Sequence, residues 1–336
     1  MNLRFLPWLA IALLGAGILS SSASAAWPGR NGPVVYIGLG PAPPGVAVSY
    51  VAAGLRTFDP DVPGSMTQLT EDHTDRDPKV SPDGRRVVFS RTISRTLEGS
   101  TSGIFVVNVD GTGLTQVTAG GPGGASDDEP TFYPSGNRIA FVRGSSEPEG
   151  RPGLYSVRLD GAGLRRVFSG TTGIRAPAVS PGGRQIVFAC RYLRDGFEIN
   201  GEHICSIRPD GSRRRDLTRR FDGQPAFDPD FSPSGRTIAF DVGPGIAADV
   251  FTMRANGARL GALTNRGPRG GRTFPRDLGY DDPAFAPAGG SLIAVARSGV
   301  RPRFVIVPLG DAAHPRRLDP SILGRAPAWA PLPPGP

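Results

Sequence analysis

The sequence predicts an all-β fold, a six-bladed β-propeller of four-stranded antiparallel blades that is closed by pairing of the N- and C-terminal strands. Three observations lead to this prediction. A short pattern, fullest in DPKVSPDGRRVVFS from Asp77, recurs six times down the chain. Successive copies lie 44 to 54 residues apart, which is the length of one four-stranded blade. Within each copy, alternating apolar and polar residues are divided by glycine-containing turns, as in short antiparallel strands.

The first full copy shows how one repeat is expected to form one blade. Pro82-Asp83-Gly84 is a turn, because proline presets its backbone angle and glycine accepts a positive φ. Asp110-Gly111 is a tight hairpin signal. The predicted strands are 79–81, 86–91, 104–109 and 114–118, with a loop over 92–103. The other copies follow the same order of strands and turns.

The two ends of the chain complete one another. Residues 34–38, 47–54 and 66–70 have the pattern of second, third and fourth strands, without a clear first strand before them. The last copy, Ala326–Pro331, supplies a first strand with no blade after it. Pairing of these ends would close the ring and cover its terminal edges, so five internal blades and one composite blade are expected.

The chain begins with a predicted secretion signal over residues 1–25. Arg4 is followed by an apolar run, Phe5–Leu19, and by the A-x-A cleavage pattern at Ala23-Ser24-Ala25. The run is shorter than the ~20 residues of a membrane-spanning helix, although an uncleaved anchor is the alternative. We expect a propeller over 27–331, a proline-rich tail over 332–336, and no transmembrane anchor once the signal is removed.

The charge of the chain is +8, and almost all of its basic residues are arginine, because Lys79 is the only lysine. This balance suits either anionic envelope partners or simply a solvated surface, since the arginines are dispersed. Nucleic acid is not expected as a partner of an exported chain. Cys190 and Cys205 fall on neighbouring predicted strands of one repeat. In an exported protein, two such cysteines are expected to form a disulfide.

Acidic residues stand immediately before four of the six repeat prolines. They are Asp77, Glu129, Asp228 and Asp282, while alanine occupies the other two places. These positions begin the innermost strands, so we expect them to gather at one mouth of the central channel. Such a ring is suited to a cation such as Ca²⁺ or to a basic segment of a partner. The alternative is structural: each carboxylate accepts backbone N–H groups at the strand entry.

No other cofactor is expected, and the sequence leaves the presence of a metal open. His73, His203 and His314 fall at unlike places in different repeats, so their spacing predicts no metal site. No catalytic residue is assigned. The loop 265–280 is the strongest candidate for recognition, because it combines arginines with aromatic residues. From it we select Arg269, Arg272 and Phe274 as candidate binding residues, and we expect Tyr280 to be exposed.

The repeats resemble those of a known family. SPDGRRVVF, YPSGNRIAF, SPGGRQIVF and SPSGRTIAF are similar to the WD40-like propeller repeats of TolB, the periplasmic component of the Tol–Pal system. Related repeats occur in the propellers of prolyl-oligopeptidase-type peptidases. The resemblance covers about residues 27–331. TolB has an α/β domain before its propeller and the peptidases have a hydrolase domain with a G-x-S-x-G elbow. Neither pattern is found in this sequence, so the propeller is expected to stand by itself.

These observations favour a bacterial protein of the periplasm, cell envelope or extracellular medium that binds without catalysis. The expected partner is a protein or a cell-envelope component, held at the channel mouth or on the loop face, as the resemblance to TolB implies. The chain is expected to be a monomer. Two alternatives stay open at this point: a glycan-active lyase or hydrolase that uses the acidic channel residues, and a purely structural disc.

Overall fold

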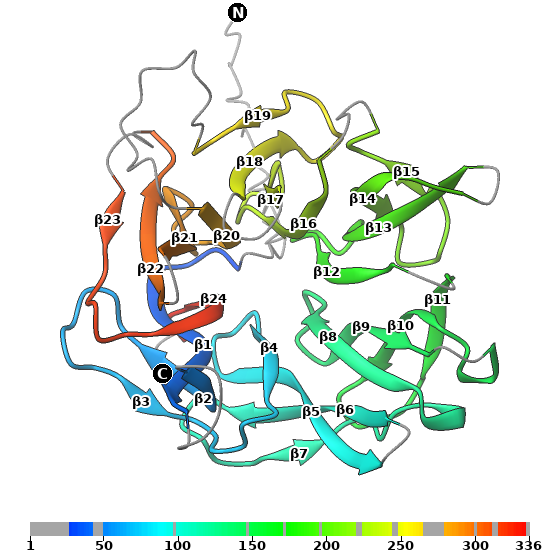
Figure 1. Cartoon of the computed structure of the whole chain (residues 1–336), viewed down its shortest axis with the longest axis horizontal. Helices are drawn as coiled ribbons and strands as arrows, with labels where there is room; N and C mark the ends of the chain where they lie inside the picture. The colour runs from blue at the N-terminus through cyan, green and yellow to red at the C-terminus, as the bar shows by residue number, and fades with distance from the viewer. Residues whose placement is uncertain are drawn as a thin grey trace, which may run out of the picture.

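The computed structural model is a ring of six antiparallel sheets, each with four strands (Figure 1). Each sheet is one blade, and the blades are numbered from the composite one. The described residues are 27–42, 50–96, 99–145, 148–170, 173–194, 197–219, 224–243, 248–264, 279–298, 301–310 and 315–333. The predicted signal at 1–25 lies outside this described part. No helix in the described ranges is long and apolar enough to cross a membrane.

The four strands of each blade follow one another from the ring axis outward. Blade 1 contains β24 (Gly324–Pro331), β1 (Asn31–Pro41), β2 (Tyr50–Phe58) and β3 (Thr67–Gln68). Blade 2 contains β4 (Arg76–Val80), β5 (Arg86–Thr96), β6 (Gly99–Asn108) and β7 (Thr115–Gln116). Blade 3 contains β8 (Ser126–Phe132), β9 (Arg138–Gly144), β10 (Gly153–Arg158) and β11 (Arg165–Ser169).

The other three blades repeat this order. Blade 4 contains β12 (Arg175–Val179), β13 (Ile186–Arg194), β14 (Phe197–Ile207) and β15 (Arg215–Asp216). Blade 5 contains β16 (Ala226–Phe231), β17 (Thr237–Val242), β18 (Asp249–Arg254) and β19 (Gly261–Ala262). Blade 6 contains β20 (Gly279–Phe285), β21 (Ser291–Ser298), β22 (Arg301–Pro308) and β23 (Arg316–Arg317). Two short 3₁₀ turns, η1 (Pro122–Gly124) and η2 (Pro148–Gly150), lie in loops of blade 3.

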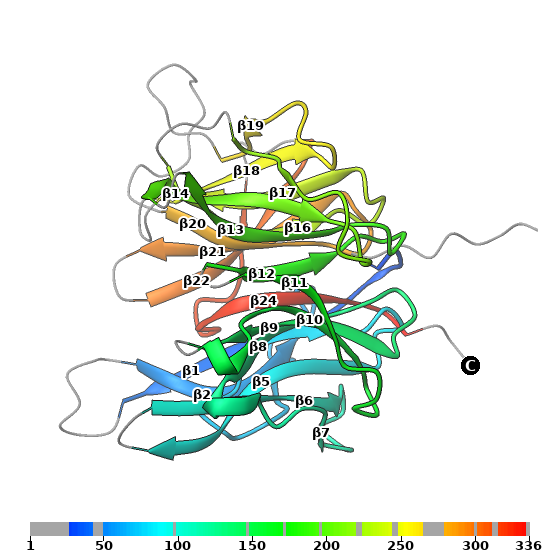
Figure 2. The same cartoon turned by 90° about the vertical axis from the view of Figure 1, so that its right-hand side faces the viewer.

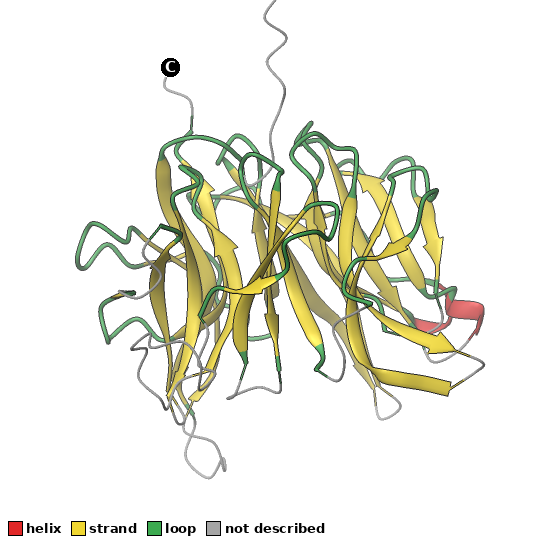
Figure 3. Ribbon diagram, turned by 90° about the horizontal axis from the view of Figure 1, so that it is seen from above, coloured by secondary structure: helices red, strands yellow, loops and turns green. Residues whose placement is uncertain are grey.

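The ring closes as the sequence predicts. The C-terminal strand β24 pairs antiparallel with β1, with Val35 opposite Ala328, and is the innermost strand of blade 1. Figure 2 shows the ring from its side, with the strands of the blades running across its thickness. Each inner strand begins at one face, which we name the entry face, and ends at the other, the exit face. Figure 3 shows the strands running between the two faces, seen from above.

Aromatic residues of the repeat form the packing between neighbouring blades. The phenylalanine of each VVF, IAF or IVF motif lies on a second strand and is fully buried; these residues are Phe89, Phe141, Phe188 and Phe240. Phe141, for example, packs in one cluster with Val88 and Ile104 of blade 2. Burial of one such side chain contributes about 1.5–3 kcal/mol, so each repeat stabilises its neighbour through a single recurring position of the pattern.

The turn after the first strand needs its glycine. In blade 2, Gly84 has φ 69° and its N–H donates to Ser81 O over 2.9 Å. A Cβ at Gly84 would lie 2.2 Å from Pro331 O of the neighbouring blade. The conformation and the space both exclude a larger residue, which explains why glycine recurs at this place in the repeat.

The predicted loop over 92–103 is wrong. Strand β5 continues to Thr96 and β6 begins at Gly99, so the segment is a hairpin arm that extends both strands. Its residues, TISRT and STSG, are rich in threonine, serine and isoleucine, and β-branched residues suit a pleated strand even when the surroundings are polar. The polar composition indicates exposure, which is correct for Ser94–Thr96, but it does not distinguish a loop from an exposed strand.

Candidate functional site

The six residues before the repeat prolines share an unusual backbone conformation. Asp77, Glu129, Ala176, Asp228, Asp282 and Ala326 have φ between 46° and 55°. At each of them the pairing of the inner strand with its neighbour shifts register, so each lies at a β-bulge. The strands begin before these residues, not at them: β8, for example, begins three residues earlier, at Ser126. The repeat proline that follows each of them has its own φ fixed by its ring.

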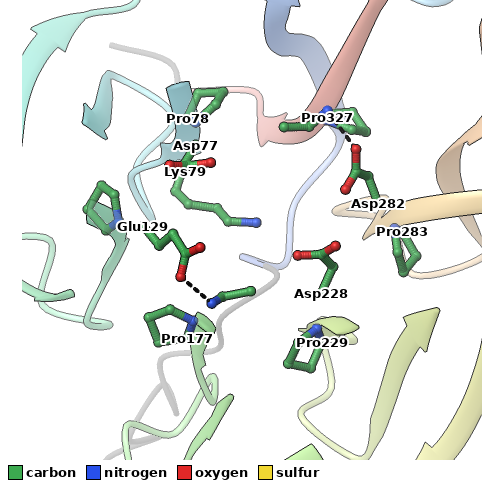
Figure 4. Close-up of a pocket in the computed structure, with 13 residues that line it drawn as sticks. Asp77, Pro78, Lys79, Glu129, Pro177, Asp228, Pro229, Asp282, Pro283 and Pro327 are labelled. Atoms are coloured by element: carbon green, nitrogen blue, oxygen red, sulfur yellow. Dashed lines mark hydrogen bonds between the residues drawn. The ribbon is translucent and has the colours of Figure 1, made fainter. Parts of the chain in front are cut away.

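The bulges bring the six positions together around the channel axis. With their prolines and Lys79 they line a cavity of about 80 Å³ near the entry face (Figure 4). The predicted binding residues Asp77, Glu129, Asp228 and Asp282 are therefore neighbours in space. The cavity is narrow, and its wall combines carboxylates with apolar proline rings.

Three of the four carboxylates accept a hydrogen bond, and two of these bonds join neighbouring blades. Glu129 Oε2 accepts the N–H of Ala176 over 2.7 Å, and Asp282 Oδ2 accepts the N–H of Ala326 over 3.0 Å. In both cases the acid of one blade binds the alanine position of the next. Asp77 Oδ2 instead accepts Ser90 Oγ over 2.9 Å, within its own blade. These bonds are of the kind expected from a structural role at the strand entry.

Asp228 and Lys79 differ from the other ring residues. Within the described ranges, no hydrogen bond and no ion pair within 4.0 Å engages the side chain of either one. Figure 4 shows the Lys79 amine extending from β4 into the space between the carboxylates. The positive charge of Lys79 favours ionisation of Asp77, Asp228 and Asp230 from a distance. The Lys79 amine thus faces four carboxylates, and among the described residues it has no hydrogen-bond or ion-pair partner of its own.

Burial changes the titration of the ring. Loss of solvent, with the charge of Asp77 adding to it, raises the pKa of Glu129 to about 8. Burial also raises the pKa of Asp77, and it raises the pKa of Asp228 well above the ordinary value, with the charge of Asp241 adding to the effect. Burial thus favours the protonated form of these acids, and a cation that enters the cavity would favour release of their protons.

Arginines neutralise most of the other acids near the ring. Arg91 binds both carboxylate oxygens of Asp75, at 2.5 and 2.8 Å. Arg143 binds both oxygens of Asp127, at 2.6 and 2.8 Å. Arg76 pairs with Asp128 at 2.6 Å and Arg297 pairs with Asp281. These acids, which are close to the ring in sequence, belong to the wall between strands and already hold a cationic partner.

Trp27 lies at the exit end of the channel. Its indole Nε1 donates to Val80 O over 3.1 Å, and its side chain is buried among blades 2 and 3. The N–H of Gly29 donates to Pro287 O over 3.3 Å, so the segment 27–29 passes from blade 2 to blade 6 across the ring. A second cavity of about 60 Å³ lies there, lined by Trp27 and by inner-strand residues of all six blades.

No metal centre is evident in the part of the chain that the structure describes. There, no three His, Cys, Asp or Glu side chains converge in an arrangement that holds a metal ion. Ca²⁺ at the ring stays a prediction that metal analysis has to test. His203 Nδ1 pairs with Asp216 at 2.9 Å, which raises the pKa of His203 through that hydrogen bond.

The remaining predictions have different outcomes: the disulfide is confirmed, three loop residues are not described, and the expected exposure of Tyr280 is wrong. Cys190 and Cys205 form a disulfide between β13 and β14. Arg269, Arg272 and Phe274 lie outside the described residues. Tyr280 is not exposed as expected: β20 begins at Gly279, so Tyr280 packs between blades and is 1% exposed.

Three residues of the channel were not predicted from the sequence. Lys79 stands out there as the single lysine, although its place next to Pro78 already puts it on an inner strand. Asp241 follows the phenylalanine of its repeat, where the other copies carry serine, valine or alanine, and this difference is a visible signal. Trp27 has no such signal, because its contact with Val80 joins residues 53 positions apart.

The fold and the channel define a repeat β-propeller with carboxylates around a narrow central cavity. The chain belongs to the TolB β-propeller domain family, PD40, whose profile matches residues 70–267. The Tol-Pal system protein TolB of Francisella tularensis subsp. holarctica (strain OSU18) is 30% identical over 122 residues, which cover 35% of this chain. That match spans only 26% of the length of the TolB protein.

Solved structures show the same fold over most of the chain. TolB from Acinetobacter baumannii superposes with a TM-score of 0.65 at 22% identity and covers 91% of this chain and 69% of its own. A putative TolB from Agrobacterium tumefaciens gives 0.58 at 16% identity, with 89% and 91% covered. An uncharacterised protein of Agrobacterium fabrum, Atu1656, is 26% identical over 164 residues, 48% of this chain and 52% of that protein.

Proposed function

We propose that this chain is an exported, non-catalytic binding propeller that holds a basic segment of a protein or cell-envelope component at its acidic channel mouth. The observation that carries the proposal is the Asp228 carboxylate, unpaired among the described residues, which lies with Asp77, Glu129 and Asp282 in a cavity at the entry face. Lys79 supplies one positive charge to four carboxylates, and a lysine or arginine side chain of a partner would supply a second charge and further donors.

The surroundings of the cavity support entry of a single side chain. A volume of about 80 Å³ suits one ammonium or guanidinium group and excludes a folded element. Trp27 lines the cavity at the opposite end of the channel, and we expect a ligand to reach the carboxylates from the entry face. The chain as a whole carries +8, so this local excess of carboxylates would distinguish the mouth from the rest of the surface.

Two further features support a proposal for the cellular compartment of the protein. The predicted signal directs export, and the Cys190–Cys205 disulfide is typical of an oxidising compartment. We therefore place the protein in the bacterial periplasm or cell envelope, or outside the cell, as a monomer without a transmembrane anchor after signal removal. Binding through the propeller is the TolB-like feature of this proposal, and the partner is identified by its basic chemistry alone.

Titration calorimetry with the mature protein and a short lysine-rich peptide tests the proposal. Asp228→Asn removes one charge without altering shape, and we expect it to weaken binding about 10-fold or more, the usual effect of a charge-assisted hydrogen bond. Asp160→Asn is the matched control, because Asp160 lies on an exposed turn, where it forms an ion pair with Arg158. Equal affinities in the three proteins would overturn the proposal.

A glutamate-rich peptide of the same length provides the second arm of this experiment. It should not bind, since the mouth carries negative charge. Turnover of acidic or neutral glycans by the wild-type protein, lost in Asp228→Asn, would instead support the lyase or hydrolase alternative.

A further inference from the structure

Blades 2 and 5 differ at one position of the channel wall. In blade 2, Ser90 of β5 lies opposite Arg76 of β4, and its hydroxyl donates to Asp77. In blade 5, the same register places Asp241 of β17 opposite Phe227 of β16, directly beside Asp228. A carboxyl group therefore occupies the place where the equivalent blade carries a hydroxyl donor.

Asp241 is enclosed by other carboxylates. It is 3% exposed, and its Oδ1 has no hydrogen-bond partner among the described residues. The charged groups that face it are Asp228 of its own blade, Asp281 and Asp282 on β20, and Arg297 on β21. Arg297 is already bound to Asp281, whose Oδ1 is likewise buried without a partner in the described part of the chain. Glu129 and Lys79 act on Asp228 from across the channel.

Full ionisation of this group of acids would be unfavourable. Adjacent buried carboxylates cannot both carry a charge without a cation between them, and they commonly share one proton. Within the described ranges, the basic groups that act on these acids are Arg297, which is engaged, and Lys79, which lies across the channel among the ring acids. Oδ1 of Asp241 and Oδ1 of Asp281 lack partners, and blade 5 lacks the hydroxyl donor that Ser90 supplies in blade 2. One explanation accounts for both observations.

We propose that Asp241 is a neutral carboxylic acid at physiological pH, that its O–H donates a hydrogen bond to Asp228 as the Ser90 hydroxyl does to Asp77, and that this shared proton makes the seam between blades 5 and 6 sensitive to pH. Loss of the proton at alkaline pH would leave two negative charges side by side next to Asp281 and Asp282. In support, burial and the neighbouring carboxylates raise the pKa of Asp241 well above its ordinary value.

Carbon-13 NMR of the mature protein labelled at aspartate carboxyl carbons tests this directly. The signal that disappears in Asp241→Asn is that of Asp241. We expect it to keep the shift of a protonated or proton-sharing carboxyl at neutral pH and to titrate together with Asp228 only above it. A signal that moves with the surface aspartates between about pH 3 and about pH 5 would overturn the proposal.

Unfolding in urea between about pH 5 and about pH 9 gives a second readout that does not need assigned signals. A proton held by the folded state is lost as the pH rises, so the wild-type midpoint should fall over this range. Asp241→Asn and Asp241→Ser keep a donor and should flatten the fall, while Asp160→Asn should follow the wild type. Parallel curves for wild type and Asp241→Asn would contradict the inference, whatever the peptide affinity of either protein.

Discussion

Blades 3 and 4 hold their second and third strands together at the same place by different chemistry. In blade 3, Arg143 of β9 lies over the ring of Tyr155 of β10 at 4.8 Å, and two hydrogen bonds to Asp127 of the first strand, β8, hold the guanidinium there. In blade 4, the equivalent positions are Cys190 and Cys205, which form a disulfide. The pairs Arg143–Tyr155 and Cys190–Cys205 occupy equivalent diagonal positions. In each, the third-strand residue faces the phenylalanine that lies two residues before its partner on the second strand.

The difference shows what the repeat fixes and what it leaves variable. The geometry of the diagonal is set by the strand register, which both blades share. The contact across the diagonal is a guanidinium over an aromatic ring in blade 3 and a covalent bond in blade 4. Blade 4 also replaces the acid: Ile174 stands where blade 3 has Asp127, so the carboxylate and its arginine are replaced together. Four measurements sharpen or break this comparison.

The largest effect is expected from removal of the blade 3 acid alone. Asp127→Ala leaves the guanidinium of Arg143 buried without its partner, which typically costs about 3–5 kcal/mol. Urea unfolding of the mature protein measures this loss as a shift of the midpoint. A loss below about 1 kcal/mol would show that Arg143 finds other partners and that the pair is not a tether.

Removal of the blade 4 disulfide should have the next largest effect. The bond joins residues 15 positions apart, and a loop of this size corresponds to about 3 kcal/mol in the chain-entropy account. Cys190→Ala/Cys205→Ala should therefore unfold at lower urea concentration than the oxidised wild type. The reduced wild type is the control and should approach the variant; an unchanged midpoint in both would contradict the role.

A smaller effect is expected from Glu129, which joins the two blades through the N–H of Ala176. Its pKa is raised to about 8, so the folded protein binds a proton that the unfolded chain releases. Stability should thus fall as the pH rises from the unfolded value of Glu129 to about 8, by about 1–2 kcal/mol with some screening by solvent. Glu129→Gln should reduce the fall by this amount and leave the part due to Asp241, and a fall of the wild-type size in the variant would assign all of it elsewhere.

The smallest effect is expected when blade 3 is given the apolar character of blade 4. Asp127→Ile/Arg143→Leu removes both charges together and leaves neither partner behind, so its cost should be near zero, or within about 1 kcal/mol. The double variant should be far more stable than Asp127→Ala. Losses that simply add would mean that the two residues act independently.

The repeat made the fold predictable because it sets the strand order, the turns and the closure of the ring. The acidic ring was also predictable as a set, since Asp77 and its equivalents share one place in the pattern. Their β-bulges were not, because a positive φ at an aspartate or glutamate arises from strand pairing and from the following proline. Partners such as Ala176 for Glu129 and Val80 for Trp27 depend on packing between blades, which local patterns do not encode.

Photo-crosslinking locates the bound peptide and tests the proposed function most directly. The lysine-rich peptide would carry a benzophenone group beside its central lysine, and mass spectrometry would map its attachment to the mature protein. We predict attachment around the entry face, at residues 74–77, 127–129 and 226–228. Attachment to the exit-face turn Pro82–Gly84 and its equivalents, or scattered attachment over the surface, would contradict binding at the acidic channel mouth.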